Sequence, residues 1–356
     1  MKRILKKILL YSLLVLFLVV AYLAYRIHAR INPKPTIAES PTSIIGFNHI
    51  GITVLDLDKM LDFYQKATQF EVLERTNISQ NESADQLYGQ EGISYEKAVL
   101  KGPNMFLELI EFNDQEDSII RKMPPQGPGM THTCYQSAES DAGYDKFKAA
   151  GVEMLTRGDG PVALGNYGVS YAYAYDPEGN MMELEQMSDF VIRLSIGQKW
   201  AKQNRLWMTQ VAILSPEIER LTDFYQTVFE IEPYRVGLYK DNPAFGEVAD
   251  LDSLSFKAAW FMLDGRGKKL ELMEYQSPNA TPNTSYQRKP TDLGYTYSLE
   301  VLDIQKEYAR LKNLGVKFVS EPKQLEHYWM VHAHDIDGNV FSLRQATDPR
   351  FSLAQF

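Results

Sequence analysis

Four ionisable residues stand in segments typical of β-strands and are of types that do chemistry together. Glu108 and Glu183 each lie between two apolar neighbours, and His49 and His132 lie in similar short runs. Because side chains alternate along a strand, the apolar neighbours can pack on one face while the carboxylates point to the other. Imidazoles and carboxylates bind divalent metals and move protons. Buried together, such groups need a shared cation, because carboxylates repel one another and lose their hydration.

The elements that must position these residues are repeated along the chain. FNHIGITVLDLDKMLDFYQKATQFE (47–71) is similar to MTQVAILSPEIERLTDFYQTVFEIE (208–232), and both predict a strand, a turn and an amphipathic helix. Apolar residues of the first helix have the i, i+3, i+4, i+7 spacing of one buried face: Leu57, Met60, Leu61 and Tyr64.

Two further matches extend the repeat. FKAAGVEML (147–155) is similar to LKNLGVKFV (311–319), each a helix end followed by glycine, and DPEGN (176–180) is similar to DIDGN (335–339), a turn between strands. Each repeat also divides into two halves, and each half reads as a strand, a helix and several short strands. The sequence therefore predicts two homologous units, 44–188 and 206–346, joined by a linker (189–205) and followed by a tail (347–356).

This organisation resembles the vicinal oxygen chelate (VOC) superfamily, which includes glyoxalase I, methylmalonyl-CoA epimerase, extradiol dioxygenases and bleomycin-resistance proteins. The resemblance covers nearly everything after residue 44. It implies an α+β fold of tandem paired βαβββ modules that form cup-shaped mixed sheets, with metal ligands projecting from the concave face. Residues 44–188 would form a VOC domain with a metal site, and 206–346 a degenerate VOC domain.

The resemblance also implies the ligand set. The family's ligand positions in the first unit hold His49, Glu108, His132 and Glu183, an order similar to that of glyoxalase I. These residues suit one divalent ion, zinc, nickel, iron or manganese. Either Glu108 or Glu183 would be the catalytic proton shuttle, and a small slip of strand register would exchange Glu183 for Glu185.

The corresponding positions of the second unit are different. They hold Gln210, Glu271, Tyr297 and Ser342, so the resemblance implies no metal site of this kind there. We therefore expect loss of His49 and His132 to abolish metal binding, and a change at Gln210 to leave it intact. A minor alternative site is formed by His332 and His334 on one predicted strand, with His327 nearby.

Three other residues are candidates for contact with a small-molecule substrate. Cys134 follows His132 by two positions, which places both on one face of a strand. Tyr171 and Tyr173 likewise share a face and could offer hydroxyl groups to a ligand. Ordinary packing in the core is the simpler interpretation of each of the three.

The reaction implied by the resemblance is a metal-dependent lyase, isomerase or epimerase reaction on an oxygen-chelating substrate. An extradiol dioxygenase is one alternative. Tyr173, the turn at 176–180 and Glu183 fit its signature, but residues 164–166 lack the expected catalytic histidine. Non-catalytic binding, as in bleomycin-resistance proteins, is the other alternative. The protein is thus expected to be an enzyme, with its substrate and oligomeric state left open.

Composition limits the partners. The 356 residues carry a formal charge of −9, and residues 1–30 hold six basic side chains and no acidic one. The remaining residues carry 31 basic and 46 acidic side chains, a formal charge of −15. Such an acidic surface repels phosphate backbones, so nucleic acid is not an expected partner. The single cysteine excludes an internal disulfide.

The N-terminus predicts a membrane anchor (1–30) and an extended, proline-containing tether (31–43). Lys2, Arg3, Lys6 and Lys7 precede the uncharged run 8–25, which would span about 27 Å as a helix. Basic residues before a span favour a cytoplasmic N-terminus, which would place the globular part outside the cytoplasm. The alternative is a cleaved signal peptide, for which Val19-Val20-Ala21 is a weak cleavage site.

Overall fold

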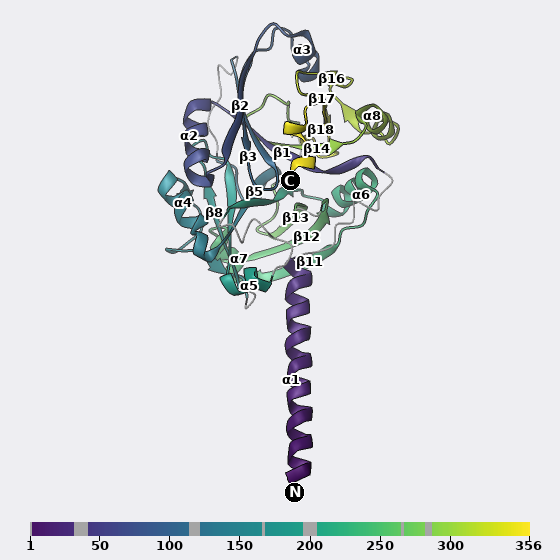
Figure 1. The fold of residues 1–356 in the computed structure, drawn as a ribbon. Coiled ribbons are helices and arrows are strands. Elements are labelled where there is room, and N and C mark those ends of the chain that lie inside the picture. The colour runs from purple at the N-terminus through teal and green to yellow at the C-terminus, as the bar shows by residue number, and fades with distance from the viewer. Residues whose placement is uncertain are drawn as a thin grey trace.

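The computed structural model describes residues 2–31, 42–113, 122–165, 168–194, 205–264, 267–281 and 287–356. Most of the predicted tether (31–43) and of the predicted linker (189–205) lies outside these ranges. The described residues form two curved β-sheets with helices packed on them, and one long helix projects from this body (Figure 1).

The projecting helix is α1 (Lys2–Ile31). Its segment Lys6–Arg26 has a mean hydropathy of 2.5 and none of it is buried. It is apolar on every side, as expected of a segment that faces lipid and not of a helix with one buried face. By length and composition α1 is able to cross a membrane, and a signal sequence would have the same properties.

Sheet A contains the strands of the first and last parts of the chain. Its order is β15-β17-β18-β14-β1-β4-β3-β2, with β16 paired to β17. The strands are β1 (Ile44–Val54), β2 (Glu71–Ile78), β3 (Tyr95–Lys101), β4 (Phe106–Phe112), β14 (Gly294–Val301), β15 (Lys317–Phe318), β16 (Lys323–Gln324), β17 (Tyr328–His334) and β18 (Val340–Ala346). We call its concave face cup A.

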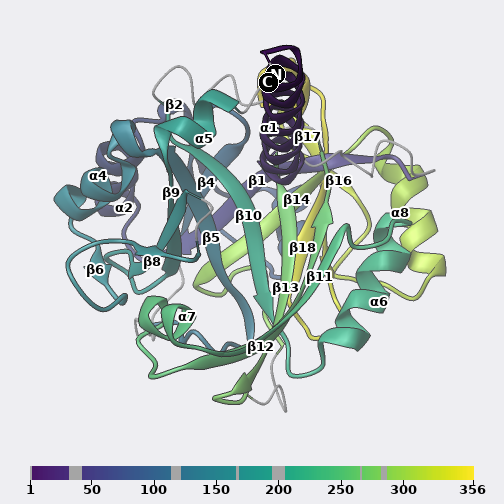
Figure 2. The same ribbon diagram turned by 90° about the horizontal axis from the view of Figure 1, so that it is seen from below.

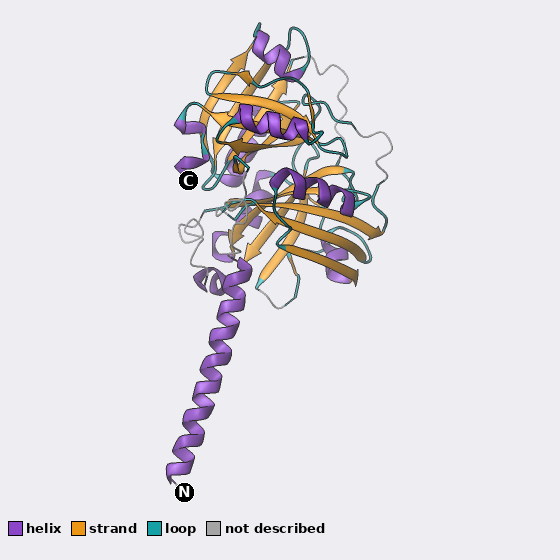
Figure 3. Ribbon diagram, turned by 90° about the vertical axis from the view of Figure 1, so that its right-hand side faces the viewer, coloured by secondary structure: helices purple, strands orange, loops and turns teal. Residues whose placement is uncertain are grey.

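Sheet B contains the strands of the middle of the chain. Its order is β11-β12-β13-β10-β5-β9-β8-β6, with β7 paired to β8. The strands are β5 (Gly129–Ala138), β6 (Glu153–Met154), β7 (Val162–Ala163), β8 (Val169–Tyr175), β9 (Met181–Met187), β10 (Trp207–Leu214), β11 (Arg235–Asn242), β12 (Leu254–Met262) and β13 (Lys269–Ser277). We call its concave face cup B. Figure 3 shows both sheets side-on, and Figure 2 shows β5 beside β10.

The predicted α+β class and the four modules are confirmed, but the modules pair differently from the prediction. The sequence interpretation joined neighbouring modules into one cup within 44–188 and another within 206–346. In the structure, β1 of the first module pairs with β14 of the fourth, and β5 of the second pairs with β10 of the third. Each predicted unit is therefore divided between the two sheets.

Helices pack on the convex side of the sheets. Four of them follow the first strand of a module: α2 (Leu57–Thr68), α4 (Gly143–Ala150), α6 (Ile218–Phe229) and α8 (Ile304–Asn313). The repeated tyrosines of α2 and α6 explain part of the sequence repeat. Tyr64 donates its hydroxyl to Asp176, and Tyr225 donates to Asp335, at 2.9 Å in both cases. The repeated turns 176–180 and 335–339 are thus attached to the repeated helices.

Two short helices lie at the cups. The α3 helix (Glu82–Tyr88) buries Ala84, Leu87 and Tyr88 against β3, β4 and β17 in cup A. The α7 helix (Pro243–Val248) lines cup B with Phe245 and Val248. The remaining elements are α5 (Asp189–Leu194) and 3-10 turns at Glu139–Asp141, Pro349–Phe351 and Leu353–Gln355.

Candidate functional site

Cup B contains an open pocket of about 500 Å³. Its walls come from strands of sheet B and from α7, and they combine aromatic rings with charged groups. The rings include Tyr171, Tyr173, Tyr239, Phe245, Phe256 and Trp260. A concave, largely apolar pocket with a few converging polar groups is the usual form of a small-molecule site.

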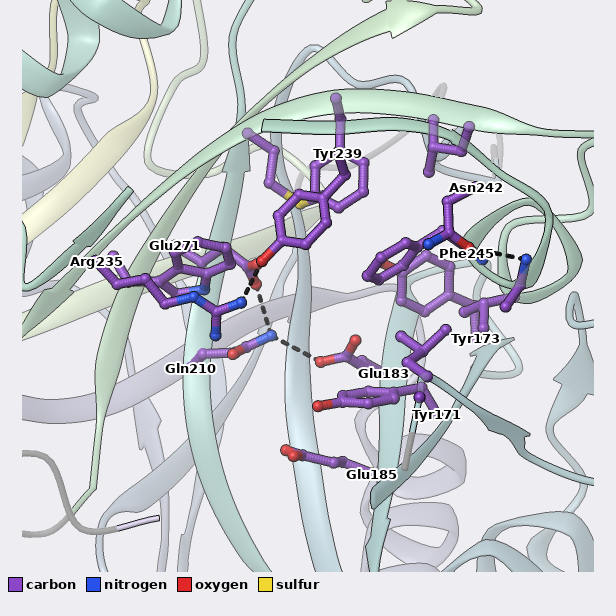
Figure 4. Close-up of a pocket in the computed structure, with 18 of the residues that line it drawn as sticks. Tyr171, Tyr173, Glu183, Glu185, Gln210, Arg235, Tyr239, Asn242, Phe245 and Glu271 are labelled. Carbon is purple, nitrogen blue, oxygen red and sulfur yellow. Dashed lines mark hydrogen bonds between the residues drawn. The ribbon is translucent and has the colours of Figure 1, made fainter. Parts of the chain in front are cut away.

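Three polar side chains meet at the base of this pocket. Gln210 of β10 donates from Nε2 to Glu183 of β9 and to Glu271 of β13, at 2.7 Å in each case (Figure 4). All three side chains are at least nine-tenths buried. The register explains the meeting, because Gln210 lies opposite Cys134 of β5, and Cys134 lies beside Glu183.

Burial favours the protonated, uncharged form of Glu183 and Glu271. It raises the pKa of Glu271 to about 7, although Lys269 and Arg235 favour the ionised form. Burial also raises the pKa of Glu183, and the charges of Glu271 and Glu185 raise it further. Since like charges in a low-dielectric pocket disfavour ionisation, this cluster gains from a shared proton or a shared cation.

His132 lies on β5, two residues from Cys134 and on the same strand face. Its ring centroid is 5.0 Å from that of Tyr173, a residue of the pocket wall. Nδ1 lies 3.0 Å from the Thr131 hydroxyl, whereas Nε2 is buried and has no hydrogen-bond partner among the described residues. Burial lowers the pKa of His132 to about 3, so the ring is neutral and can offer a lone pair.

The other predicted substrate residues also belong to cup B. Tyr171 and Tyr173 line the pocket together with Glu185. Cys134 is fully buried and donates from Sγ to Glu185 at 3.5 Å. Burial, with the charges of Glu183 and Glu185, raises the pKa of this thiol, so Cys134 is not a thiolate nucleophile.

Cup A holds the other two predicted ligands, His49 of β1 and Glu108 of β4. His49 Nε2 lies 3.6 Å from Glu108 Oε1. Glu108 Oε2 also faces two buried cations, with Lys97 Nζ at 3.6 Å and Arg344 Nη1 at 3.4 Å. Burial alone would raise the pKa of Glu108, but Lys97, His49 and Arg344 together lower it to about 2. The carboxylate is thus neutralised by side chains of the protein.

The predicted set of four ligands is therefore divided. His49 and Glu108 lie in cup A, and His132 and Glu183 lie in cup B, because each cup combines modules from different predicted units. Within the described residues, no group of three or more His, Cys, Asp or Glu side chains has the arrangement of a metal site. The four residues do not share one hollow, and this part of the sequence interpretation is corrected.

The interpretation of the second unit also changes. Gln210 and Glu271, which the sequence analysis set aside, are the residues that join Glu183 in cup B. Tyr297, which the sequence interpretation placed at a ligand position, does not face cup A. Its hydroxyl lies 2.6 Å from that of Tyr225 on α6, on the convex side of sheet A. Ser298 is the residue that lies opposite His49.

The remaining histidines do not form the alternative site. His332 faces cup A, with its ring centroid 5.0 Å from that of Tyr88. His334 Nε2 lies 2.8 Å from the carbonyl of Arg288, and His327 lies 2.8 Å from Glu74. The sequence analysis missed Arg235 and Lys269 in cup B. A signal existed for Lys269, because it shares the strand alternation of Glu271.

Comparisons with known proteins agree with this architecture. A family model described as the Glyoxalase/Bleomycin resistance protein/Dioxygenase superfamily matches residues 46–184. The uncharacterized protein YetH of Bacillus subtilis (strain 168) is 34% identical over 89 residues, which are 25% of this chain and 68% of YetH.

Two solved structures have a similar fold over most of the chain. Glyoxalase I from Zea mays aligns with a TM-score of 0.56 and 20% identity, over 87% of this chain and 95% of the maize chain. A Bacillus subtilis protein that carries the provisional name dioxygenase aligns with a TM-score of 0.56 and 11% identity, over 85% of this chain and 86% of its own. At these identities the likeness concerns the fold alone.

Proposed function

The chain belongs to the glyoxalase/bleomycin resistance protein/dioxygenase superfamily, and on this premise we propose that cup B is the active site of a metal-dependent lyase or isomerase. The substrate class is a small molecule with two neighbouring oxygen atoms. The observation that carries the proposal is the contact of Gln210 with both Glu183 and Glu271 at the base of an open pocket.

Cup B offers the kinds of donor group that bind a divalent cation, and its side chains must move to bring three of the His, Asp or Glu donors to one ion. Glu183 and Glu271 offer carboxylate oxygens, Gln210 offers an amide oxygen if its side chain turns over, and His132 offers an unpartnered Nε2. Oxygen and imidazole donors of this kind suit zinc, nickel, iron or manganese. A bound cation would also relieve the repulsion that raises the pKa of both carboxylic acids.

A bound metal ion would polarise the substrate oxygens and make a neighbouring C–H bond more acidic. The protein's own groups would do the rest. Glu271 and Glu183 are the candidate bases that take up and return the proton, because both carboxyl groups reach the base of the pocket. Arg235 and Lys269 can hold an anionic part of the substrate, and the rings of the wall exclude water.

The matched positions of cup A do not support the same function. His49 corresponds to Gln210, and Glu108 corresponds to Glu271, by their places in the repeated modules. Arg344 and Lys97 both lie within 4 Å of Glu108, and a divalent cation there would meet two positive charges. We therefore assign the proposed metal site to cup B.

Metal analysis of the full chain in detergent micelles tests the proposal. After metal removal and dialysis against zinc, nickel or manganese, we expect about one ion per chain. Glu271→Gln should reduce affinity by about tenfold or more, because it removes one charged ligand. Glu108→Gln is the matched control in cup A and should retain the metal.

The result expected from sequence alone was the reverse, with Gln210 dispensable and His49 required. Metal retained in Glu271→Gln but lost in Glu108→Gln would return the site to cup A and overturn the proposal. An absence of metal in the wild-type chain would also overturn the proposal.

Activity separates the reaction classes. A lyase or isomerase site should catalyse metal-dependent deuterium exchange at C3 of 2-oxobutanoate, with loss of exchange in Glu271→Gln. Oxygen uptake with catechol would instead indicate a ring-cleaving dioxygenase. Ligand binding without either reaction would indicate a binding protein of the bleomycin-resistance type.

We also infer that α1 is retained as a membrane anchor and that the two cups lie outside the cytoplasm. Two features support this inference. No side of the apolar segment is buried, and basic residues precede it. Protease treatment of intact cells and of opened cells, followed by detection of both chain ends, tests this topology. A mature chain that begins after residue 21 would show that the segment is a cleaved signal.

A further inference from the structure

Cup A contains a cluster of buried polar atoms without hydrogen-bond partners among the described residues. They are Nε and Nη2 of Arg344, both ring nitrogens of His332, and Oγ of Ser298. The three residues lie on the adjacent strands β18, β17 and β14, where Ser342 is the strand neighbour of both Ser298 and His332. Buried polar groups nearly always have a partner, so a cluster of unpaired ones indicates something that binds there.

The charged groups around the cluster limit the kind of ligand that it can bind. Lys97 and Arg344 are both fully buried, and both face the one carboxylate of Glu108. A second buried acid, Glu300, lies on β14 beside the strand of Arg344. Its oxygens accept hydrogen bonds from the Asn48 side chain, the Ser352 hydroxyl and the Leu353 backbone amide. Glu300 is also the direct strand neighbour of Arg344, so two buried acids accompany the two buried cations. Because Glu300 is already held by three neutral donors, the sign of the ligand follows from the unused N–H groups of Arg344, which bind an anion more strongly than a neutral acceptor.

The orientation of Arg344 indicates the shape of the ligand. Nη1 is directed to His49 Nδ1 at 3.2 Å and to Glu108, which leaves the Nε and Nη2 edge of the guanidinium group unused. The guanidinium carbon lies 3.6 Å from the ring centroid of Tyr328, and this stacking fixes the plane of the group. Two parallel N–H groups on one planar edge match the two oxygens of a carboxylate.

We propose that cup A binds a small carboxylate anion, held by Nε and Nη2 of Arg344 and assisted by Ser298 and His332. We limit the ligand to the size of formate or acetate, because Tyr88 of α3 and Phe351 of the C-terminal tail pack into the same cup. This site is independent of the metal site proposed for cup B.

The C-terminal tail covers this site. Phe351 is fully buried against Val99 and Phe106 of cup A, and its carbonyl accepts a hydrogen bond from Asn48 at 3.0 Å. Asn48 Oδ1 in turn lies 2.9 Å from His49 Nδ1. The tail is thus attached to the residues of the cluster, and entry of an anion requires residues 349–355 to move.

Titration of the full chain in detergent micelles with sodium formate tests the proposal. Sodium chloride keeps the ionic strength constant, and binding is followed by calorimetry and by broadening of the resonance of carbon-13-labelled formate. We expect saturable binding at one site per chain, weakened about tenfold or more in Arg344→Lys, because lysine keeps the charge but lacks the planar pair of donors. The control variant Arg75→Lys changes an exposed arginine that pairs with Asp58 and Glu96 outside the cups, and it should bind formate as the wild type does.

Several results would overturn the proposal. These are formate binding no tighter than that of chloride, affinity unchanged in Arg344→Lys, or affinity lost in Arg75→Lys. If Arg344→Lys fails to fold, Ser298→Ala serves instead and should weaken binding several-fold, and an unchanged affinity would count against the site. Phe351→Ala should speed formate exchange, and an unchanged rate would exclude the tail as the cover.

Discussion

Cups A and B are built from homologous modules joined in the same way, yet their centres have opposite electrical character. In cup A, Lys97 and Arg344 face Glu108, and the cup is filled by α3 and the C-terminal tail. In cup B, Glu183 and Glu271 meet at Gln210 at the base of an open pocket.

The two cups have different residues at a few corresponding strand positions. The position that holds Glu185 in cup B holds Arg344 in cup A, because both lie two residues after the matched pair Glu183 and Ser342. The position of Tyr173 in cup B is that of His332 in cup A, as each lies opposite one member of that pair. The proposed cation site and the proposed anion site thus differ in which side chains occupy these strand positions of the same scaffold.

Removal of one arginine from each cup should give the largest difference between the cups. Arg344→Met should lower the free energy of unfolding by about 3–5 kcal/mol, because it leaves Glu108 buried with one cation instead of two and removes the stacking on Tyr328. Arg235→Met should cost less than about 1 kcal/mol, because Arg235 is only half-buried. Urea unfolding measures both, and equal costs would contradict the view of cup A as a closed, charged core.

The matched carboxylates should respond to pH in opposite ways. Glu108, with its pKa lowered to about 2, contributes stability above pH 4.5 that is lost as the pH falls towards 2. Glu271, with its pKa raised to about 7, contributes most to the stability of the metal-free protein below pH 4.5. This contribution is lost as the pH rises through 7. Each contribution is at most about 3 kcal/mol.

Substitution of each glutamate by glutamine tests this pH dependence. Glu108→Gln should remove part of the acid limb of the stability curve, and Glu271→Gln should remove part of its alkaline limb. Unfolding in urea with a chelator present, at a series of pH values, measures both curves. The same direction of change in both variants would show that the cups are electrically alike.

The smallest expected difference concerns two hydroxyl groups. Tyr328→Phe leaves the fully buried Lys97 without the hydroxyl that accepts its hydrogen bond at 2.7 Å, at a cost of about 1–3 kcal/mol. In cup B, Tyr239→Phe removes the hydroxyl that accepts a hydrogen bond from the half-buried Arg235, which water can replace, at a cost below about 0.5 kcal/mol. Thermal unfolding compares the two, and a larger cost in cup B would contradict its openness.

Much of the fold was predictable from local sequence. The buried face of α2 is formed by Leu57, Met60 and Tyr64, as their helical spacing predicts. The repeated tyrosines and turns were also visible, because homologous modules need the same contacts. The cup to which each module belongs was not predictable, since strand pairing between distant modules leaves no mark on local hydrophobic pattern.

The candidate site shows the same limit. Glu183 and His132 were identified from strand alternation and resemblance, and they lie in cup B. Gln210 and Glu271 stood at recognised ligand positions but were excluded, because the predicted partner modules were wrong. Lys97 and Arg344, which neutralise Glu108, gave no local signal, since a basic residue in a strand is ordinarily solvated.

The sequence by itself determined four βαβββ modules, an apolar N-terminal helix and the strand faces that carry ionisable side chains, because these follow from periodicities of two and 3.6 residues. Only the tertiary structure decided which faces meet. The first module pairs with the fourth and the second with the third, so His49 and Glu108 face two cations while Glu183 joins Glu271. The physical reason is that the charge and pKa of a buried group depend on neighbours from distant strands, which the order of residues along one strand does not specify.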